Sequence, residues 1–163
     1  MSDIWVVDAS PVIALAKADR LHLLLDLSRE LLIPEAVVAE ILAGPPSDPA
    51  RQALQRGWGL PVAPHHISPD LLEWGLGVGE TAVLAVAMER TPATAVLDDA
   101  AARTCAKALG IEVVGTLGVV LRAKRKALIP SAADVLKAMR TAGLRLNDEV
   151  ARSALQRVGE TWE

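Results

Sequence analysis

The sequence predicts an α/β fold in which a short central parallel sheet is flanked by helices. Short apolar, β-branched runs alternate with helical patterns along the chain, and this alternation is typical of a parallel sheet covered by helices on both faces. The length of 163 residues suits one ordinary domain. No repeat, low-complexity tract or interdomain linker interrupts the pattern. We therefore expect residues 1–163 to form a single domain, with the helices from about residue 117 packed on it.

The first half of the chain predicts two strands, at residues 4–7 and 31–33. The first strand meets Asp8, and Ser10 followed by Pro11 is the signature of a helix start with Ser as N-cap. Further helices are expected over residues 21–27, 34–42 and 50–56. Because residues 47–77 are rich in Pro and Gly, we expect irregular connections after residue 56.

The second half predicts two more strands and a helix-rich C-terminal part. The strands are expected over residues 95–97 and 113–114, and the helices over residues 79–90, 100–109, 117–127, 132–142 and 148–158. Gly110 suits the end of the second of these helices.

Composition excludes several classes of protein. Apolar residues make up 52% of the chain, but no apolar run approaches the roughly 20 residues of a membrane span. We see no export signal, and Cys105, the single cysteine, can form neither an intramolecular disulfide nor a multi-thiolate metal site. We therefore expect a cytoplasmic protein with a buried, inert thiol. The net charge of −3 and the absence of Phe and Tyr disfavour a broad basic surface or a base-stacking sheet for nucleic acid.

Carboxylates follow two of the predicted strands. Asp8 ends the first strand, and Asp98 and Asp99 end the strand over residues 95–97. Functional groups of open α/β sheets gather beyond the carboxyl ends of the strands, so these side chains should share one edge. Asp98 or Asp99 is equally suited to cap the following helix. Asp8 has no evident structural task, because Ser10 already suits the cap of its helix, although a turn could still use the carboxylate.

Two glutamates lie on or beside inward helix faces. Glu40 lies near a helix C-terminus, where the helix dipole disfavours a carboxylate by about 0.3–1 kcal/mol, so another interaction should offset that cost. The alternative is a solvated position at the edge of the apolar face. Glu80 follows Gly79 at a helix start, where stabilisation of the dipole is the alternative to a functional role.

Carboxylates that converge at one sheet edge repel one another, so they either retain protons or bind a hard divalent cation. The cation is the interpretation we favour. Magnesium bound by a few carboxylates and waters, with phosphate oxygens as further ligands, suits phosphodiester hydrolysis. The histidines do not suit zinc, because His22 stands alone and His65 adjoins His66 in a Pro-rich segment.

The segments around these carboxylates resemble the acidic motifs of PIN domains, and most closely a prokaryotic PIN-like branch of the DUF3368 type. They are residues 7–13 with Asp8, 37–41 with Glu40, 77–82 with Glu80, 97–103 with Asp98 and Asp99, and 115–118, which read Gly-Thr-Leu-Gly. The resemblance covers nearly the whole chain. It implies a three-layer α/β/α fold, Mg²⁺- or Mn²⁺-dependent endoribonuclease activity, and frequent service as the toxin of a toxin–antitoxin pair, commonly as a homodimer.

The resemblance also implies a metal site. Its ligands are Asp8, Glu40, Glu80 and Asp98, with Asp99 competing with Asp98 for the fourth position. Ser10 matches the small hydroxyl residue beside the first Asp. The chain departs from well-studied PIN toxins in having Glu80 in place of the third Asp, and Asp98-Asp99 in place of Thr-x-Asp.

Basic residues form one dense cluster after the last predicted strand: Arg122, Lys124, Arg125 and Lys126. They either attract the RNA backbone or satisfy the dipole at a helix C-terminus. Arg103 is placed to pair with Asp99 or to touch phosphate. The leading hypothesis is a metal-dependent ribonuclease with an RNA substrate and an antitoxin partner. The alternative is a catalytically inactive PIN-like binding or regulatory protein.

Overall fold

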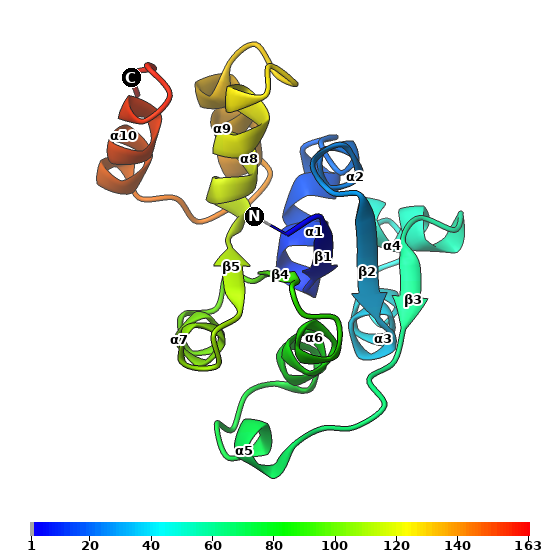
Figure 1. The fold of residues 1–163 in the computed structure, drawn as a ribbon. Helices are drawn as coiled ribbons and strands as arrows, with labels where there is room; N and C mark the ends of the chain where they lie inside the picture. Colours follow the sequence, from blue (N-terminus) through cyan, green and yellow to red (C-terminus); the bar gives the residue numbers. More distant parts are fainter. Residues whose placement is uncertain (1) are drawn as a thin grey trace.

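A five-stranded parallel sheet forms the centre of the computed structural model, which describes residues 2–163. Its strands are β1 (Ile4–Val7), β2 (Glu30–Pro34), β3 (Leu60–Val62), β4 (Thr94–Val96) and β5 (Glu112–Val114). They lie in the order β3-β2-β1-β4-β5, and every neighbouring pair is parallel (Figure 1). The predicted α/β class is therefore confirmed.

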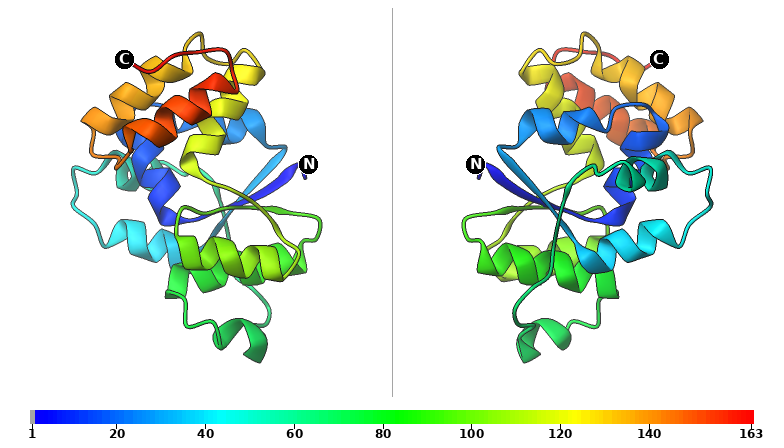
Figure 2. Two further views of the ribbon diagram at one scale, coloured as in Figure 1. Left: turned by 90° about the vertical axis from the view of Figure 1, so that its left-hand side faces the viewer. Right: turned by 90° about the vertical axis from the view of Figure 1, so that its right-hand side faces the viewer.

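Helices lie on both faces of the sheet. They are α1 (Ala9–Lys17), α2 (His22–Leu27), α3 (Glu35–Leu42), α4 (Pro49–Gln55), α5 (Pro69–Leu72), α6 (Val78–Glu89), α7 (Ala100–Ala108), α8 (Thr116–Arg125), α9 (Ala132–Thr141) and α10 (Asp148–Gln156). Helices α3, α6 and α7 cover one face, while α2, α8, α9 and α10 lie on the other side (Figure 2). This is the three-layer arrangement that the resemblance implied.

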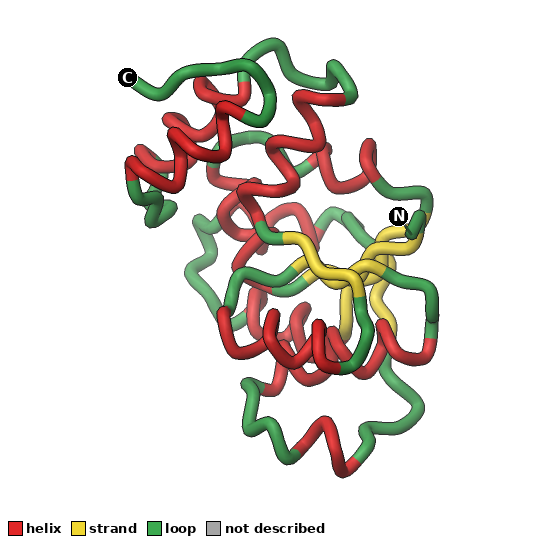
Figure 3. The backbone as a smooth tube through the Cα atoms, turned by 60° about the vertical axis from the view of Figure 1, so that its left-hand side comes forward, coloured by secondary structure: helices red, strands yellow, loops and turns green. Residues whose placement is uncertain are grey.

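Strand β3 was not predicted. It pairs with β2 at one edge of the sheet, contains Pro61, and leaves Leu60 51% exposed. Proline is tolerated in edge strands because its missing N–H is not needed on the solvent side. An exposed three-residue strand with a central proline shows no clear apolar pattern in the sequence. Its formation depends on its pairing with β2. The connection from β3 to α6 loops away from the sheet and contains only the short helix α5 (Figure 3).

The start of α1 also differs from the prediction. The helix begins at Ala9, so Asp8 occupies the N-cap position and Ser10 lies inside the first turn. The Asp8 side chain makes no capping hydrogen bond. Asp8 thus remains without a structural task, although Ser10 is not the cap that the sequence indicated.

The buried core positions the elements around the site. Trp5, Val6 and Val7 of β1 are completely buried, as is the whole of β4, because helices cover both faces of the sheet. Cys105 is buried and free, as predicted. Residues 81–87 of α6 are all buried, and most are small. Their size lets α6 pack closely on β1, β2 and β4 and brings its first turn close to the end of β1.

The C-terminal helices are tied together by one carboxylate. Glu160 accepts hydrogen bonds from the backbone N–H groups of Ala132 and Ala133 at 2.8 and 2.9 Å, and its Oε2 lies 3.4 Å from Lys124 Nζ. These bonds satisfy free N–H groups at the start of α9. Helix α8 in turn packs against α1, α2 and α9.

Within residues 2–163, no helix combines the length and apolar character needed to cross a bilayer.

Candidate metal centre

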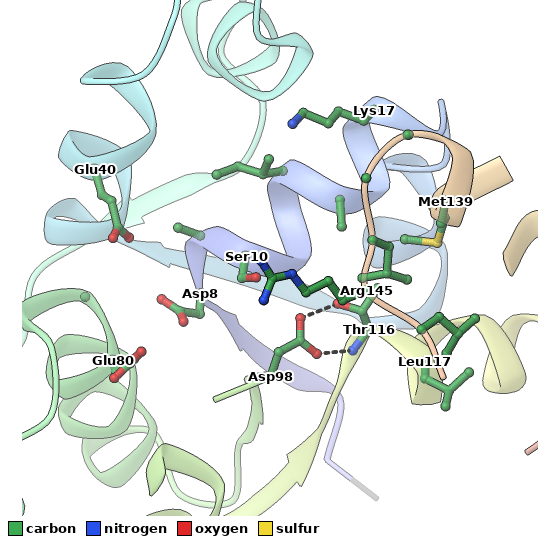
Figure 4. A pocket seen from close by; sticks show the side chains of 18 of the residues that line it. Asp8, Ser10, Lys17, Glu40, Glu80, Asp98, Thr116, Leu117, Met139 and Arg145 are labelled. Atoms are coloured by element: carbon green, nitrogen blue, oxygen red, sulfur yellow. Dashed lines mark hydrogen bonds between the residues drawn. The ribbon is translucent and has the colours of Figure 1, made fainter. Parts of the chain in front are cut away.

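The candidate site lies where the direction of strand addition reverses. Strand β1 has β2 on one side and β4 on the other, so the connections that leave β1 and β4 diverge. A crevice at the carboxyl ends of the strands is expected at such a point. A cavity of about 760 Å³ occupies it, lined among others by Asp8, Ser10, Glu40, Glu80 and Asp98 (Figure 4). Four carboxylates from separate stretches of the chain therefore share one cavity.

Asp8 is the buried member of the group. Its backbone N–H donates to Val96 O at 3.1 Å, which extends the β1–β4 ladder, and the residue is only 6% exposed. Its Oδ1 is buried without a hydrogen-bond partner among residues 2–163. Burial is the main cause that raises the pKa of Asp8 to about 6; the Ala9 N–H is the next largest effect and opposes it, and the negative charges of Glu80, Glu40 and Asp98 add smaller increases. A buried orphan oxygen of this kind needs an explanation.

Glu40 and Asp8 approach each other across Gly79. Glu40 lies in the last turn of α3, is exposed, and lines the cavity. A Cβ atom at Gly79 would lie 3.3 Å from Glu40 Oε2 and 3.4 Å from Asp8 Oδ1. Gly79, in the first turn of α6, therefore lets both carboxylates reach the same part of the cavity. Glu40 is thus exposed and also lines the cavity, so both interpretations of its position fit, and its role stays a prediction.

Glu80 has two roles. Its Oε2 accepts a hydrogen bond from the Gly77 N–H at 3.2 Å, so it satisfies a free donor at the start of α6. The same half-buried carboxylate lines the cavity and contributes to the raised pKa of Asp8. The structural and the functional interpretation of Glu80 are therefore compatible.

Asp98 and Asp99 have different positions. Asp98 lines the cavity, and its two oxygens accept hydrogen bonds from Thr116, from the backbone N–H at 2.8 Å and from the Oγ hydroxyl at 2.6 Å (Figure 4). Asp99 caps α7, with Oδ2 accepting from the Ala102 N–H at 2.9 Å, and it does not line the cavity. The structure therefore brings Asp98 and not Asp99 into the cavity, and which of the two binds a metal stays a prediction.

The predicted basic residues divide in a similar way. Arg122 lies 3.7 Å from Glu112 Oε1 and over the Trp5 ring, while Lys124 donates to Pro130 O at 2.7 Å and pairs with Glu160. Both side chains therefore hold elements together. Arg125 and Lys126 are exposed at the end of α8.

Arg103 does not pair with Asp99, which was one of its two predicted roles. Among residues 2–163 the two form no ion pair, and Arg103 Nη1 instead donates to Leu97 O at 3.3 Å. The contact with phosphate stays a prediction.

Residues 4–160 match the DUF3368 family model, which is described as a PIN domain. The chain belongs to the PIN-domain family. This membership indicates a nuclease-type function, since PIN domains are generally nucleases and typically use divalent metal ions. No curated protein matches the chain.

Three residues of the PIN cavity were not recognised in the sequence. Thr116 holds Asp98, and it could have been found because it lies in the Gly-Thr-Leu-Gly segment, two residues after the end of the last strand. Lys17, in the last turn of α1, and Arg145, in the connection between α9 and α10, also line the cavity. Arg145 points into it (Figure 4). No sequence motif predicts the position of either cation, because helices far apart in sequence must pack together before both side chains line the cavity.

The residues present in this PIN domain fit a hard divalent cation. Within residues 2–163, no group of three or more His, Cys, Asp or Glu side chains is arranged around one point to hold a metal. Magnesium, however, is commonly bound through one or two carboxylates together with waters and substrate phosphates. The carboxylates of the cavity offer oxygen ligands, no His or Cys is among its lining residues, and Asp8 Oδ1 is a buried oxygen without a hydrogen-bond partner among residues 2–163. Of the histidines, His65 lies beside Glu89, with 3.1 Å between Nδ1 and Oε2.

Proposed function

We propose that this PIN domain is a Mg²⁺- or Mn²⁺-dependent endoribonuclease. The observation that carries the proposal is the environment of Asp8, a buried carboxylate with an orphan oxygen in a cavity to which three other carboxylates contribute negative charge. Such a group of like charges is unfavourable without a counterion. Family membership supplies independent support for phosphodiester chemistry.

Each side chain has a distinct part in the proposed site. Asp8, Glu40 and Asp98 would hold the ion, and Glu80 would add charge from the start of α6. Thr116 fixes both oxygens of Asp98, so that carboxylate keeps one orientation. When bound, the divalent cation supplies the positive charge that activates water and stabilises the negative charge developing on the phosphate.

Substrate binding in this cavity depends on charge balance. Without a cation the four carboxylates repel a phosphodiester, so productive binding requires the ion. Lys17 and Arg145 line the same cavity and attract the RNA backbone. The RNA contact is then local, in keeping with a net charge of −3.

The substitution Glu40→Gln tests the proposal, with Glu35→Gln as a matched control. The wild-type protein is expected to cut single-stranded or structured RNA with Mn²⁺ or Mg²⁺ and to stop in EDTA. Glu40→Gln should lower the rate by at least about tenfold, since even outer partners of metal ligands typically contribute 10–100-fold. Glu35→Gln, in the first turn of the same helix and outside the cavity, should cut at the wild-type rate. The measurement is the initial rate on a fluorescent RNA at saturating Mn²⁺.

The alternative is an inactive PIN-like binding protein. It predicts no cleavage by the wild type in any divalent cation and no effect of Glu40→Gln on any property of the protein other than surface charge. Equal cleavage by wild type, Glu40→Gln and Glu35→Gln would also exclude the proposed site, because an activity indifferent to Glu40 would come from elsewhere.

The proposal extends to the biological setting. Toxin function in a toxin–antitoxin pair, a homodimeric state and binding of an antitoxin protein rest on the family resemblance, whereas a cytoplasmic location rests on the use of a single cysteine. Expression of a toxin of this kind is expected to arrest growth of a bacterial host, and expression of Glu40→Gln should not. Growth curves after induction, with equal protein levels verified by immunoblotting, test this. Equal growth of both strains contradicts the toxin role but leaves the nuclease chemistry open to its own assay.

A further inference from the structure

A second cavity adjoins the acidic one. It measures about 650 Å³, and it shares Asp98, Leu117 and Val150 with the first cavity as lining residues. Its other lining residues differ sharply in charge from those of the first. Four arginines line it, namely Arg103, Arg122, Arg125 and Arg157, against the two carboxylates of Asp98 and Glu149. An acidic cavity and a predominantly basic one are therefore neighbours.

Two of these arginines lie exposed at helix ends. Arg125, in the last turn of α8, and Arg157, at the C-cap of α10, are both exposed and form no ion pair within residues 2–163. Each cation alone is favoured by the dipole of its own helix. The dipoles do not explain why cations from two helices line the same cavity, where they repel each other. An anion between them would remove that repulsion.

Arg103 lies at the boundary of the two cavities. A Cβ atom at Gly115 would lie 2.5 Å from Arg103 Nη1 and 3.0 Å from Asp98 Oδ1. The missing side chain at Gly115 is therefore what allows the guanidinium of Arg103 and the carboxylate of Asp98 to approach the same point. Because Asp98 lines both cavities, a group bound near Arg103 would be adjacent to one bound in the acidic cavity.

We propose that the second cavity binds a backbone phosphate of an RNA strand next to the phosphodiester that enters the acidic cavity. This inference rests on the proposed function and deepens it, because it assigns the neighbouring phosphate to Arg103, Arg125 and Arg157. It also divides the basic cluster of α8. Lys126 lines neither cavity, and Lys124 is held by Pro130 and Glu160. The strand thus crosses from the acidic cavity over Gly115 to the ends of α8 and α10.

Removal of two cations tests this placement by binding alone. The probe is a fluorescent single-stranded RNA with Ca²⁺ in place of Mg²⁺, and the readout is its affinity as a function of NaCl concentration. Arg125→Gln combined with Arg157→Gln should weaken binding at low salt and reduce the slope of log K against log salt by about 0.7 for each arginine that no longer neutralises a phosphate, roughly 1.4 in all. Lys126→Gln removes a charge from the residue beside Arg125 and should leave the slope close to wild type. Circular dichroism should show that all three proteins are folded.

A substrate with a single phosphate provides the second arm. Bis(4-nitrophenyl) phosphate reaches the acidic cavity but has no neighbouring phosphate, so its Mn²⁺-dependent hydrolysis should be unchanged in the double variant. On an RNA oligonucleotide the same variant should show a raised KM with an unchanged kcat. Equal slopes for the wild type and the double variant, an equal effect in Lys126→Gln, or no RNA binding by the wild type would each overturn the subsite. Wild-type RNA binding with the predicted slope change but without cleavage of either substrate would instead retain the subsite and refute the nuclease.

Discussion

Asp8→Asn is expected to abolish RNA cleavage and, in metal-free buffer at pH 7.5, to make the folded protein more stable. The two effects have one cause. The buried negative charge of Asp8 is needed to bind the metal, and it destabilises the folded protein when no metal is bound. Loss of a direct ligand should lower the cleavage rate by at least about a hundredfold, since outer partners alone contribute 10–100-fold. Raising the pKa of Asp8 from 3.8 to about 6 corresponds to a folding cost of up to about 3 kcal/mol at neutral pH.

The stability effect should depend on pH in a defined direction. The folded-state pKa of Asp8 is raised, so the favourable contribution of the protonated group is complete below about pH 3.8 and is lost as the pH rises through about 6. The free energies of unfolding of wild type and Asp8→Asn should therefore be close at pH 4. Above pH 6.5 the variant should be more stable by about 1–3 kcal/mol, the lower values arising because an amide also leaves a buried polar atom unpaired. Urea denaturation in EDTA across this range measures the difference.

Asp26→Asn is the matched control for charge removal. Asp26 is exposed in α2 and lies outside both cavities. Its substitution should not reproduce the pH-dependent gain. A stability difference between wild type and Asp8→Asn that stays constant from pH 4 to pH 8, or a variant that is less stable at every pH, would contradict the assigned environment of Asp8.

Thr116→Val is expected to lower Mn²⁺ affinity and RNA cleavage by about tenfold, within the 10–100-fold range of partners that orient metal ligands. The hydroxyl of Thr116 donates to Asp98 Oδ2 at 2.6 Å, and Thr116 is itself buried. Valine keeps the shape but cannot donate. The backbone N–H of Thr116 still holds the other oxygen of Asp98 at 2.8 Å, so we expect the lower end of the range.

Conservative and remote substitutions separate positioning from stability. Thr116→Ser retains the hydroxyl and should restore most of the Mn²⁺ affinity. Thr104→Val removes a hydroxyl on the exposed surface of α7, where it donates to Ala100 O at 3.0 Å, and should leave metal affinity unchanged. If Thr116→Val lowers only the unfolding temperature and not the Mn²⁺ affinity, Thr116 has no positioning role.

The sequence predicted most of the fold because its strands and helices carry strong local patterns. Strands β1 and β4 are buried on both faces, so they read as short apolar runs, and the carboxylates after them follow directly. Strand β3 lacks such a run because it lies at the edge, contains Pro61 and is stabilised by its pairing with β2. The start of α1 was misplaced by two residues, because a Ser-Pro pair suits the first turn as well as the cap.

Within the site, the limit of prediction was the direction of side chains. Asp98 and Asp99 are adjacent and chemically equivalent, so only the backbone conformation decides that Asp99 caps α7 while Asp98 faces the cavity. Arg145 reaches the cavity from the far end of the chain, and no local pattern predicts that position. The basic cluster of α8 was recognised as a unit, whereas its members serve different contacts according to their position around the helix.

Isothermal titration of the metal-free protein with Mn²⁺ at pH 7.5 tests the central claim most directly, because it requires neither an RNA nor a partner. Wild type should bind at least one ion with saturable heat, and Asp8→Asn should show no binding or a strongly weakened one. No heat in the wild type, or the same affinity in both proteins, would contradict the assignment of these carboxylates to a divalent metal site.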